Sequence, residues 1–111
     1  MMQDPLYDNV DFIRENVRRK DRLTQLAEEC CELSHAALKL LRVLHLAGTP
    51  TPLPAHVAER QFYEEVADVL VCLLAEGSIY AVAAPSYVGD IADKKAERWV
   101  QRIKEKKAAD D

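Results

Sequence analysis

The sequence has few of the residues that build turns and sheets. Only 3 of its 111 residues are glycine, and aromatic residues make up 6%. No segment alternates apolar and polar residues between turn signals, as the strands of an antiparallel sheet do. The apolar residues, 49% of the chain, are mainly leucine, valine and alanine, which suit packing between helices. The composition therefore predicts an all-α protein, and the length predicts a single domain over residues 1–111.

Cysteines, excess basic charge and uninterrupted apolar runs are also scarce. Three cysteines, two of them adjacent, cannot form a disulfide framework, and the start MMQDPLYDNV has no signal-peptide pattern, so we expect a cytoplasmic protein. The net charge of −4 argues against a nucleic-acid partner, because phosphate binding requires a basic surface. The most apolar stretch, residues 66–84, contains Asp68 and Glu76, which are costly inside a bilayer. This stretch is predicted to be a buried helix and not a membrane span.

Helical periodicity predicts four helices separated by proline and glycine, covering approximately residues 8–20, 21–46, 56–83 and 90–107. Asp8 or Asn9 would cap the first helix, and Gly48 would end the second. The following GTPTPLP excludes a helix because its prolines remove backbone donors, and Pro85 and Gly89 would break the chain again. The expected fold is an antiparallel helical bundle that is completed by oligomerisation, as a homodimer or homotetramer.

Polar residues of the predicted third helix gather on one narrow strip. On a helical wheel the strip is about 80° wide, and it holds Gln61, Glu65, Asp68, Cys72 and Glu76. The rest of the circumference is mostly apolar, and no lysine or arginine occurs between Gln61 and Ala84. Because buried carboxylates without a partner are costly, the strip is expected to gain a cationic partner.

The predicted second helix carries a matching group of acids, Glu28, Glu29 and Glu32, on one flank of its apolar stripe. Glu29 and Glu32 are three residues apart, as are Glu65 and Asp68. If the two helices pack antiparallel, these pairs can face each other. Clusters of carboxylate oxygens select hard cations, chiefly Mg²⁺ and sometimes Mn²⁺.

Other interpretations of these residues have to be weighed. An isolated Glu-x-x-Glu on a surface helix is usually solvated charge. A di-iron bundle needs Glu-x-x-His motifs; His35 follows Glu32 at this spacing, but no equivalent histidine follows Asp68. Cys30 and Cys31 lack the spacing of a zinc site, so Cys30 is interpreted as a core residue, Cys31 as a small filler and Cys72 as a buried thiol.

Two segments, LAEECCEL (residues 26–33) and FYEEVADVLVCLL (residues 62–74), resemble the paired acidic motifs of the MazG-like all-α nucleoside triphosphate pyrophosphohydrolases. The later DKKAERWVQRI (residues 93–103) resembles the basic helix that often ends members of this family. The resemblance covers about residues 22–103. The chain departs from the compact members in its long linker, residues 48–60, between the two acidic motifs.

The resemblance implies hydrolysis of a nucleoside triphosphate between its α and β phosphates, giving a monophosphate and pyrophosphate. It implies that Mg²⁺ is held by Glu29, Glu32, Glu65 and Asp68. Glu28 would be an auxiliary acid, and either Glu28 or Glu32 would accept the proton of the attacking water. Lys95 and Arg98 would bind the substrate phosphates, with Lys94 as a substitute.

Two further functions stay open at this point: a catalytically inactive α-helical interaction domain, and an enzyme acting on phosphoribosyl-ATP. Base recognition would come from one of the aromatic residues Phe62, Tyr63 and Trp99, among which the sequence does not choose.

Overall fold

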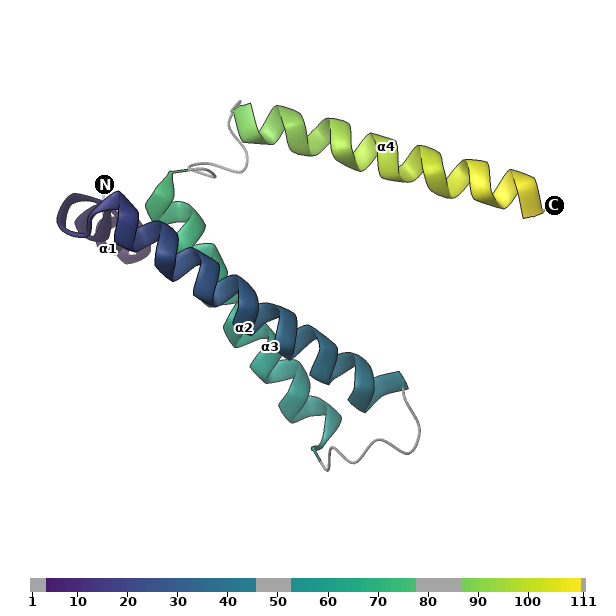
Figure 1. Ribbon diagram of the computed structural model, residues 1–111, viewed down its shortest axis with the longest axis horizontal. Coiled ribbons are helices and arrows are strands. Elements are labelled where there is room, and N and C mark those ends of the chain that lie inside the picture. The colour runs from purple at the N-terminus through teal and green to yellow at the C-terminus, as the bar shows by residue number, and fades with distance from the viewer. Residues whose placement is uncertain (1–3, 46–52, 78–86, 111) are drawn as a thin grey trace. The chain divides into compact units, whose positions relative to one another are not determined.

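The computed structural model describes residues 4–45, 53–77 and 87–110. These residues form four α-helices and no strand, α1 (Pro5–Asn16), α2 (Arg19–His45), α3 (Ala55–Glu76) and α4 (Tyr87–Asp110), as Figure 1 shows. The all-α prediction is thus confirmed for this part of the chain. Contacts divide the chain into two compact units, Met1–Gly77 and Ser78–Asp111. In the three described ranges, no helix combines the length and the apolar character that crossing a membrane requires.

The first helix begins earlier than predicted. Asp4 is its N-cap, because the Asp4 side chain accepts a hydrogen bond from the Leu6 N–H at 2.9 Å, and Pro5 occupies the first turn. Neither Asp8 nor Asn9 is the cap. The helix ends at Asn16, and α2 already starts at Arg19, so the predicted range 8–20 was wrong at both ends.

Gly77 ends α3 well before the predicted residue 83. Its φ of 85° lies in the left-handed region, and its N–H donates to the carbonyl oxygens of Leu73 and Leu74. α4 was also misjudged, because it starts at Tyr87 and runs through Gly89 to Asp110. The predicted breaks at Gly48 and Pro85 lie outside the described residues.

α2 and α3 lie side by side, with the start of α2 next to the end of α3 (Figure 1). At one end the Arg22 Nε lies 3.5 Å from a Glu76 carboxylate oxygen, and further along the Lys39 Nζ donates to the Gln61 side chain at 3.4 Å. The half-buried residues of α2 recur every three or four positions and include Leu26, Glu29, Leu33, Ala36 and Leu40. One carboxylate, Glu29, therefore belongs to the stripe that faces α3.

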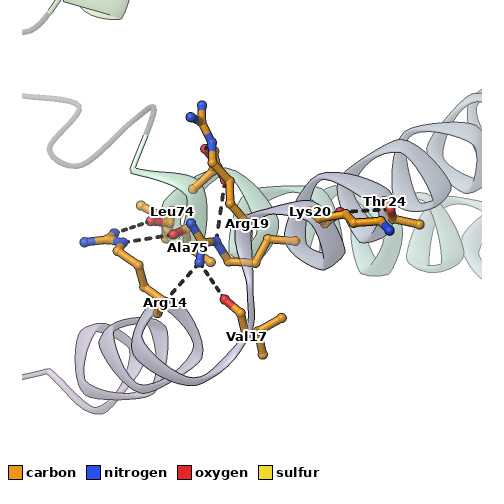
Figure 2. A network of polar contacts seen from close by, with 9 residues as sticks. Arg14, Val17, Arg19, Lys20, Thr24, Leu74 and Ala75 are labelled. Carbon is orange, nitrogen blue, oxygen red and sulfur yellow. Dashed lines mark hydrogen bonds and ion pairs between the residues drawn. The ribbon is translucent and has the colours of Figure 1, made fainter.

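α1 packs against the end of α3, where an arginine binds the free carbonyl groups of that helix. The Arg14 Nε donates to the Ala75 carbonyl at 2.9 Å and its Nη2 to the Leu74 carbonyl at 2.7 Å (Figure 2). Arg19 and Arg22 approach the same end through Glu76. Positive charge here stabilises the negative end of the α3 dipole.

Replacing Arg14 with alanine is expected to lower the free energy of unfolding by about 1.5–3 kcal/mol, because two charge-assisted hydrogen bonds to α3 are lost. Urea unfolding followed by circular dichroism measures this. Arg18→Ala is the matched control. Within the described residues the Arg18 side chain is found only in an exposed ion pair with Asp21 at 3.5 Å, so its loss is expected to change stability by less than about 1 kcal/mol. Equal losses in the two variants would contradict the role of Arg14.

Candidate functional site

Three carboxylates from two helices converge between α2 and α3. Glu29 of α2 and Glu65 and Asp68 of α3 each place one oxygen within 4.8 Å of the other two. The spacing of three residues puts Glu65 and Asp68 on one side of α3, and the pairing of the helices brings Glu29 opposite them. Three of the four predicted cation ligands therefore lie together.

Glu65 is the most strongly perturbed member of this cluster. Its side chain is half-buried, and its Oε2 is shielded from solvent without a hydrogen-bond partner. Desolvation raises the pKa of Glu65, and the charges of Asp68, Glu29, Glu32 and Glu64 raise it further. Glu29, in contrast, accepts a hydrogen bond from the Gln25 Nε2 at 2.7 Å. A carboxylate in the position of Glu65 is stabilised by a proton or by a cation.

Glu32 lies at the edge of the cluster and is not one of the three carboxylates whose oxygens converge. It is exposed, and it shares with Glu65 the lining of an open groove of about 320 Å³. The other residues that line the groove are His35, Ala36, Lys39, Gln61 and Glu64. Glu28 is exposed and is not among these lining residues. Lys39 was not among the predicted site residues, although it follows Glu32 by seven residues, two turns along the same face of α2.

A second, more apolar cavity of about 310 Å³ adjoins the cluster on the side of α1. Its lining comes from three helices and from Val17, which follows α1: Ile13, Val17, Asp21, Arg22, Gln25, Val71, Cys72 and Ala75. Gln25 connects the two features, because it lines this cavity and donates to Glu29. The pKa of the Cys72 thiol is raised by burial and also by the charges of Glu29, Asp68 and Cys30.

One prediction about an individual residue of these helices was wrong. Cys30 was expected in the core but is exposed, as Cys31 is, while Cys72 is half-buried. Glu76 belongs to the acidic strip that was expected to gain a cationic partner, and it is paired with Arg19 at 2.7 Å and with Arg22 at 3.5 Å. Its charge is therefore compensated within the fold.

The predicted phosphate-binding residues lie on α4, in the second unit. Lys95 and Arg98, with Trp99 and Arg102, line a cavity of about 350 Å³, and all four side chains are exposed. Of the other aromatic candidates, Phe62 is half-buried and Tyr63 is exposed, with its hydroxyl donating to Glu59 at 2.9 Å.

The raised pKa of Glu65 predicts that the metal-free protein loses stability as the pH rises. The folded state holds the Glu65 proton more tightly than the unfolded chain does. This proton therefore contributes its full stabilisation below the pKa that Glu65 has in the unfolded chain, and the contribution is lost as the pH rises through the pKa of Glu65 in the folded state. Thermal unfolding in EDTA, measured across this pH range, should show a decline in Tm that Glu65→Gln reduces. Identical pH profiles for the two proteins would contradict the prediction.

Comparisons with protein-family models, curated proteins and solved structures give no match for this chain. The resemblance to MazG-like enzymes thus stays a prediction from the acidic and basic motifs.

Proposed function

We propose that this chain is a Mg²⁺-dependent nucleotide pyrophosphohydrolase of the MazG-like type, which converts an NTP or dNTP to its monophosphate and pyrophosphate. The observation that carries the proposal is the convergence of Glu29, Glu65 and Asp68 around a shielded Glu65 oxygen that has no hydrogen-bond partner. Three carboxylate oxygens this close repel one another unless a positive group lies between them.

The donor set fits a hard divalent cation, Mg²⁺ or alternatively Mn²⁺. Glu29, Glu65 and Asp68 would hold it, and Glu32, one turn beyond Glu29 on α2, is the fourth predicted ligand. When bound, the cation would neutralise phosphate charge and increase the acidity of water. Glu65 would then be ionised in the loaded protein, because a nearby cation stabilises the charged form of a carboxyl group.

The chain's own residues would carry the proton and the phosphates. Attack by water forms one phosphorus–oxygen bond and breaks the bridging bond between the α and β phosphates. The water proton would pass to a carboxylate at the edge of the cluster. Glu32 is better placed for this than Glu28, because it lines the groove that Glu65 also lines. Lys95 and Arg98 would bind the pyrophosphate leaving group and offset its charge.

The neighbouring apolar cavity provides room for the base. Its walls, which include Ile13, Val17 and Val71, suit a planar ring, and Asp21 and Gln25 offer hydrogen-bonding groups at its edge. Gln25 contacts Glu29, so a base held there would lie next to the cation that the carboxylates would hold.

Association of chains belongs to the same proposal. Among the described residues only four hydrophobic side chains are buried: Val10, Ala58, Leu74 and Ala75. So small a core is insufficient for a chain of this length, and oligomerisation is a common remedy. An antiparallel bundle completed by a homodimer or homotetramer would supply the missing burial.

The decisive experiment measures pyrophosphate release from the eight common NTPs and dNTPs and from phosphoribosyl-ATP, with Mg²⁺, Mn²⁺ or EDTA. We expect Mg²⁺-dependent release from at least one NTP or dNTP. Release from phosphoribosyl-ATP alone would support the related enzyme, and no release from any substrate would leave the α-helical interaction domain.

A further inference from the structure

The apolar cavity and the open groove of the first unit lie on opposite sides of the carboxylate cluster along α2. The α2 residues that line the cavity fall within 21–25 and those that line the groove within 32–39, and Glu29 of the cluster lies between the two ranges. The residues that α3 contributes follow the reverse order, 71–75 at the cavity and 61–65 at the groove. A nucleotide with its base in the cavity and its α-phosphate at the cation would therefore extend its β and γ phosphates into the groove.

The groove contains a lysine whose donors are largely unused. Among the described residues that line it, Lys39 alone carries a fixed positive charge. Its side chain is half-buried, and its Nζ donates to the Gln61 Oε1 at 3.4 Å, beyond the typical range of about 2.7–3.2 Å. An ammonium group has three donors, and this long bond is the only one found for the Lys39 Nζ within residues 4–45, 53–77 and 87–110. Lys39 therefore has donors left for phosphate oxygens.

The acidic residues of the groove do not neutralise this lysine. Glu32, Glu64 and Glu65 also line the groove, but no ion pair of Lys39 is found in the part of the chain that the structure describes. A lysine that only balanced these acids would contact one of them. Its ammonium group lies instead at Gln61, one turn of α3 before Glu65, on the side away from the apolar cavity.

We propose that Lys39 binds the β and γ phosphates of the nucleotide, which then lies along α2 with its base toward α1 and its triphosphate toward Lys39. The inference rests on the proposed function, to which it adds a phosphate-binding residue of the first unit and the direction of the substrate. Hydrogen bonds between an ammonium group and phosphate are charge-assisted and stronger than neutral ones. Because three carboxylates line the same groove, the phosphates would enter it only together with the cation.

Binding of inorganic pyrophosphate in excess Mg²⁺, measured by isothermal titration calorimetry, tests the role of Lys39 without turnover. The unmodified chain should bind pyrophosphate with Mg²⁺ and not in EDTA. Lys39→Gln should bind it at least roughly tenfold more weakly, because a hydrogen bond to a charged group is lost. Lys39→Arg should restore most of the affinity. Glutamine can still donate to Gln61, so Lys39→Gln keeps the contact between the two helices.

Lys20→Gln is the matched control, because Lys20 is an exposed residue of α2 that is not among the residues lining the cavity or the groove. Its affinity for pyrophosphate should equal that of the unmodified chain. Equal affinities in Lys39→Gln and Lys20→Gln would overturn the role of Lys39, and pyrophosphate release by the unmodified chain would show that the proposed function stands nevertheless.

Comparison of a monophosphate with its triphosphate tests the direction of the substrate. A nucleoside monophosphate carries only the phosphate next to the sugar, so Lys39→Gln should leave its binding unchanged and weaken that of the triphosphate roughly tenfold. Equal weakening of both would overturn the proposed direction. If the unmodified chain neither binds pyrophosphate nor releases it from any nucleotide, the inference and the proposed function both fail. Binding that depends on Lys39, without release from any nucleotide, would support the role of Lys39 and reject the enzyme.

Discussion

Replacing Glu65 with glutamine is expected to reduce pyrophosphate release from the preferred nucleotide by roughly 1,000-fold. A cation stabilises charge in the transition state by several kcal/mol, and each 1.36 kcal/mol corresponds to about a factor of ten in rate. Glutamine keeps the size and one oxygen of the side chain but removes the charge that would attract the cation. Steady-state kinetics with Mg²⁺ in excess measures the loss.

A second readout separates cation binding from damage to the fold. Mg²⁺ should raise the Tm of the unmodified protein and have a much smaller effect on Glu65→Gln, because ligand binding stabilises only the state that binds. In EDTA the variant should be at least as stable as the unmodified chain, since the repulsion from Glu29 and Asp68 is relieved. Glu59→Gln is the matched control, because the only side-chain hydrogen bond found for Glu59 within the described residues comes from the Tyr63 hydroxyl. Unchanged turnover in Glu65→Gln would contradict the proposed site.

The convergence of Glu29 with Glu65 and Asp68 could be predicted from the sequence because it depends on two regular features. Residues three apart share one side of a helix, and two consecutive helices joined by a linker commonly pack side by side. The convergence follows without knowledge of any single side-chain conformation. The same reasoning placed Glu28 and Glu32 nearby but did not distinguish them, since their separation from the cluster depends on how α2 is rotated against α3.

Glu76 illustrates what the sequence of one helix leaves hidden. The third helical segment contains no lysine or arginine after Gln61, and this made Glu76 look unpaired. Its partners, Arg19 and Arg22, come from the start of α2, more than fifty residues away in the chain. The end of α3 was also misplaced: the prediction continued the helix through Gly77 to residue 83, but Gly77 takes the left-handed conformation that closes the helix.

Cys30 shows that periodicity identifies an apolar stripe without saying what covers it. The sequence contains both stripes of α2, and Leu26 and Leu33 belong to the stripe that faces α3. Cys30 belongs to the other, which is exposed in a single chain. The prediction of a core position for Cys30 was therefore wrong, because periodicity alone does not say which stripe a neighbouring helix covers.

Replacing both Lys95 and Arg98 with glutamine is expected to lower kcat/KM for the preferred nucleotide about 100-fold, the effect of removing positive groups that stabilise a developing negative charge. Both residues line one cavity on α4, and no ion pair with an acidic residue is found for either within the described residues. They are therefore available to bind phosphate. Steady-state kinetics of the double variant, with pyrophosphate release as the signal, measures the loss.

The matched control for this pair is Lys106→Gln combined with Lys107→Gln, which removes the same charge from the end of α4, outside that cavity. If the two double variants lose activity equally, the effect is one of net charge and the specific role of Lys95 and Arg98 is rejected. If only the Lys95 and Arg98 variant loses activity and its Mg²⁺-induced rise in Tm persists, the two functions are separable. The loss of activity would then come from weaker phosphate binding by Lys95 and Arg98 and not from loss of the cation.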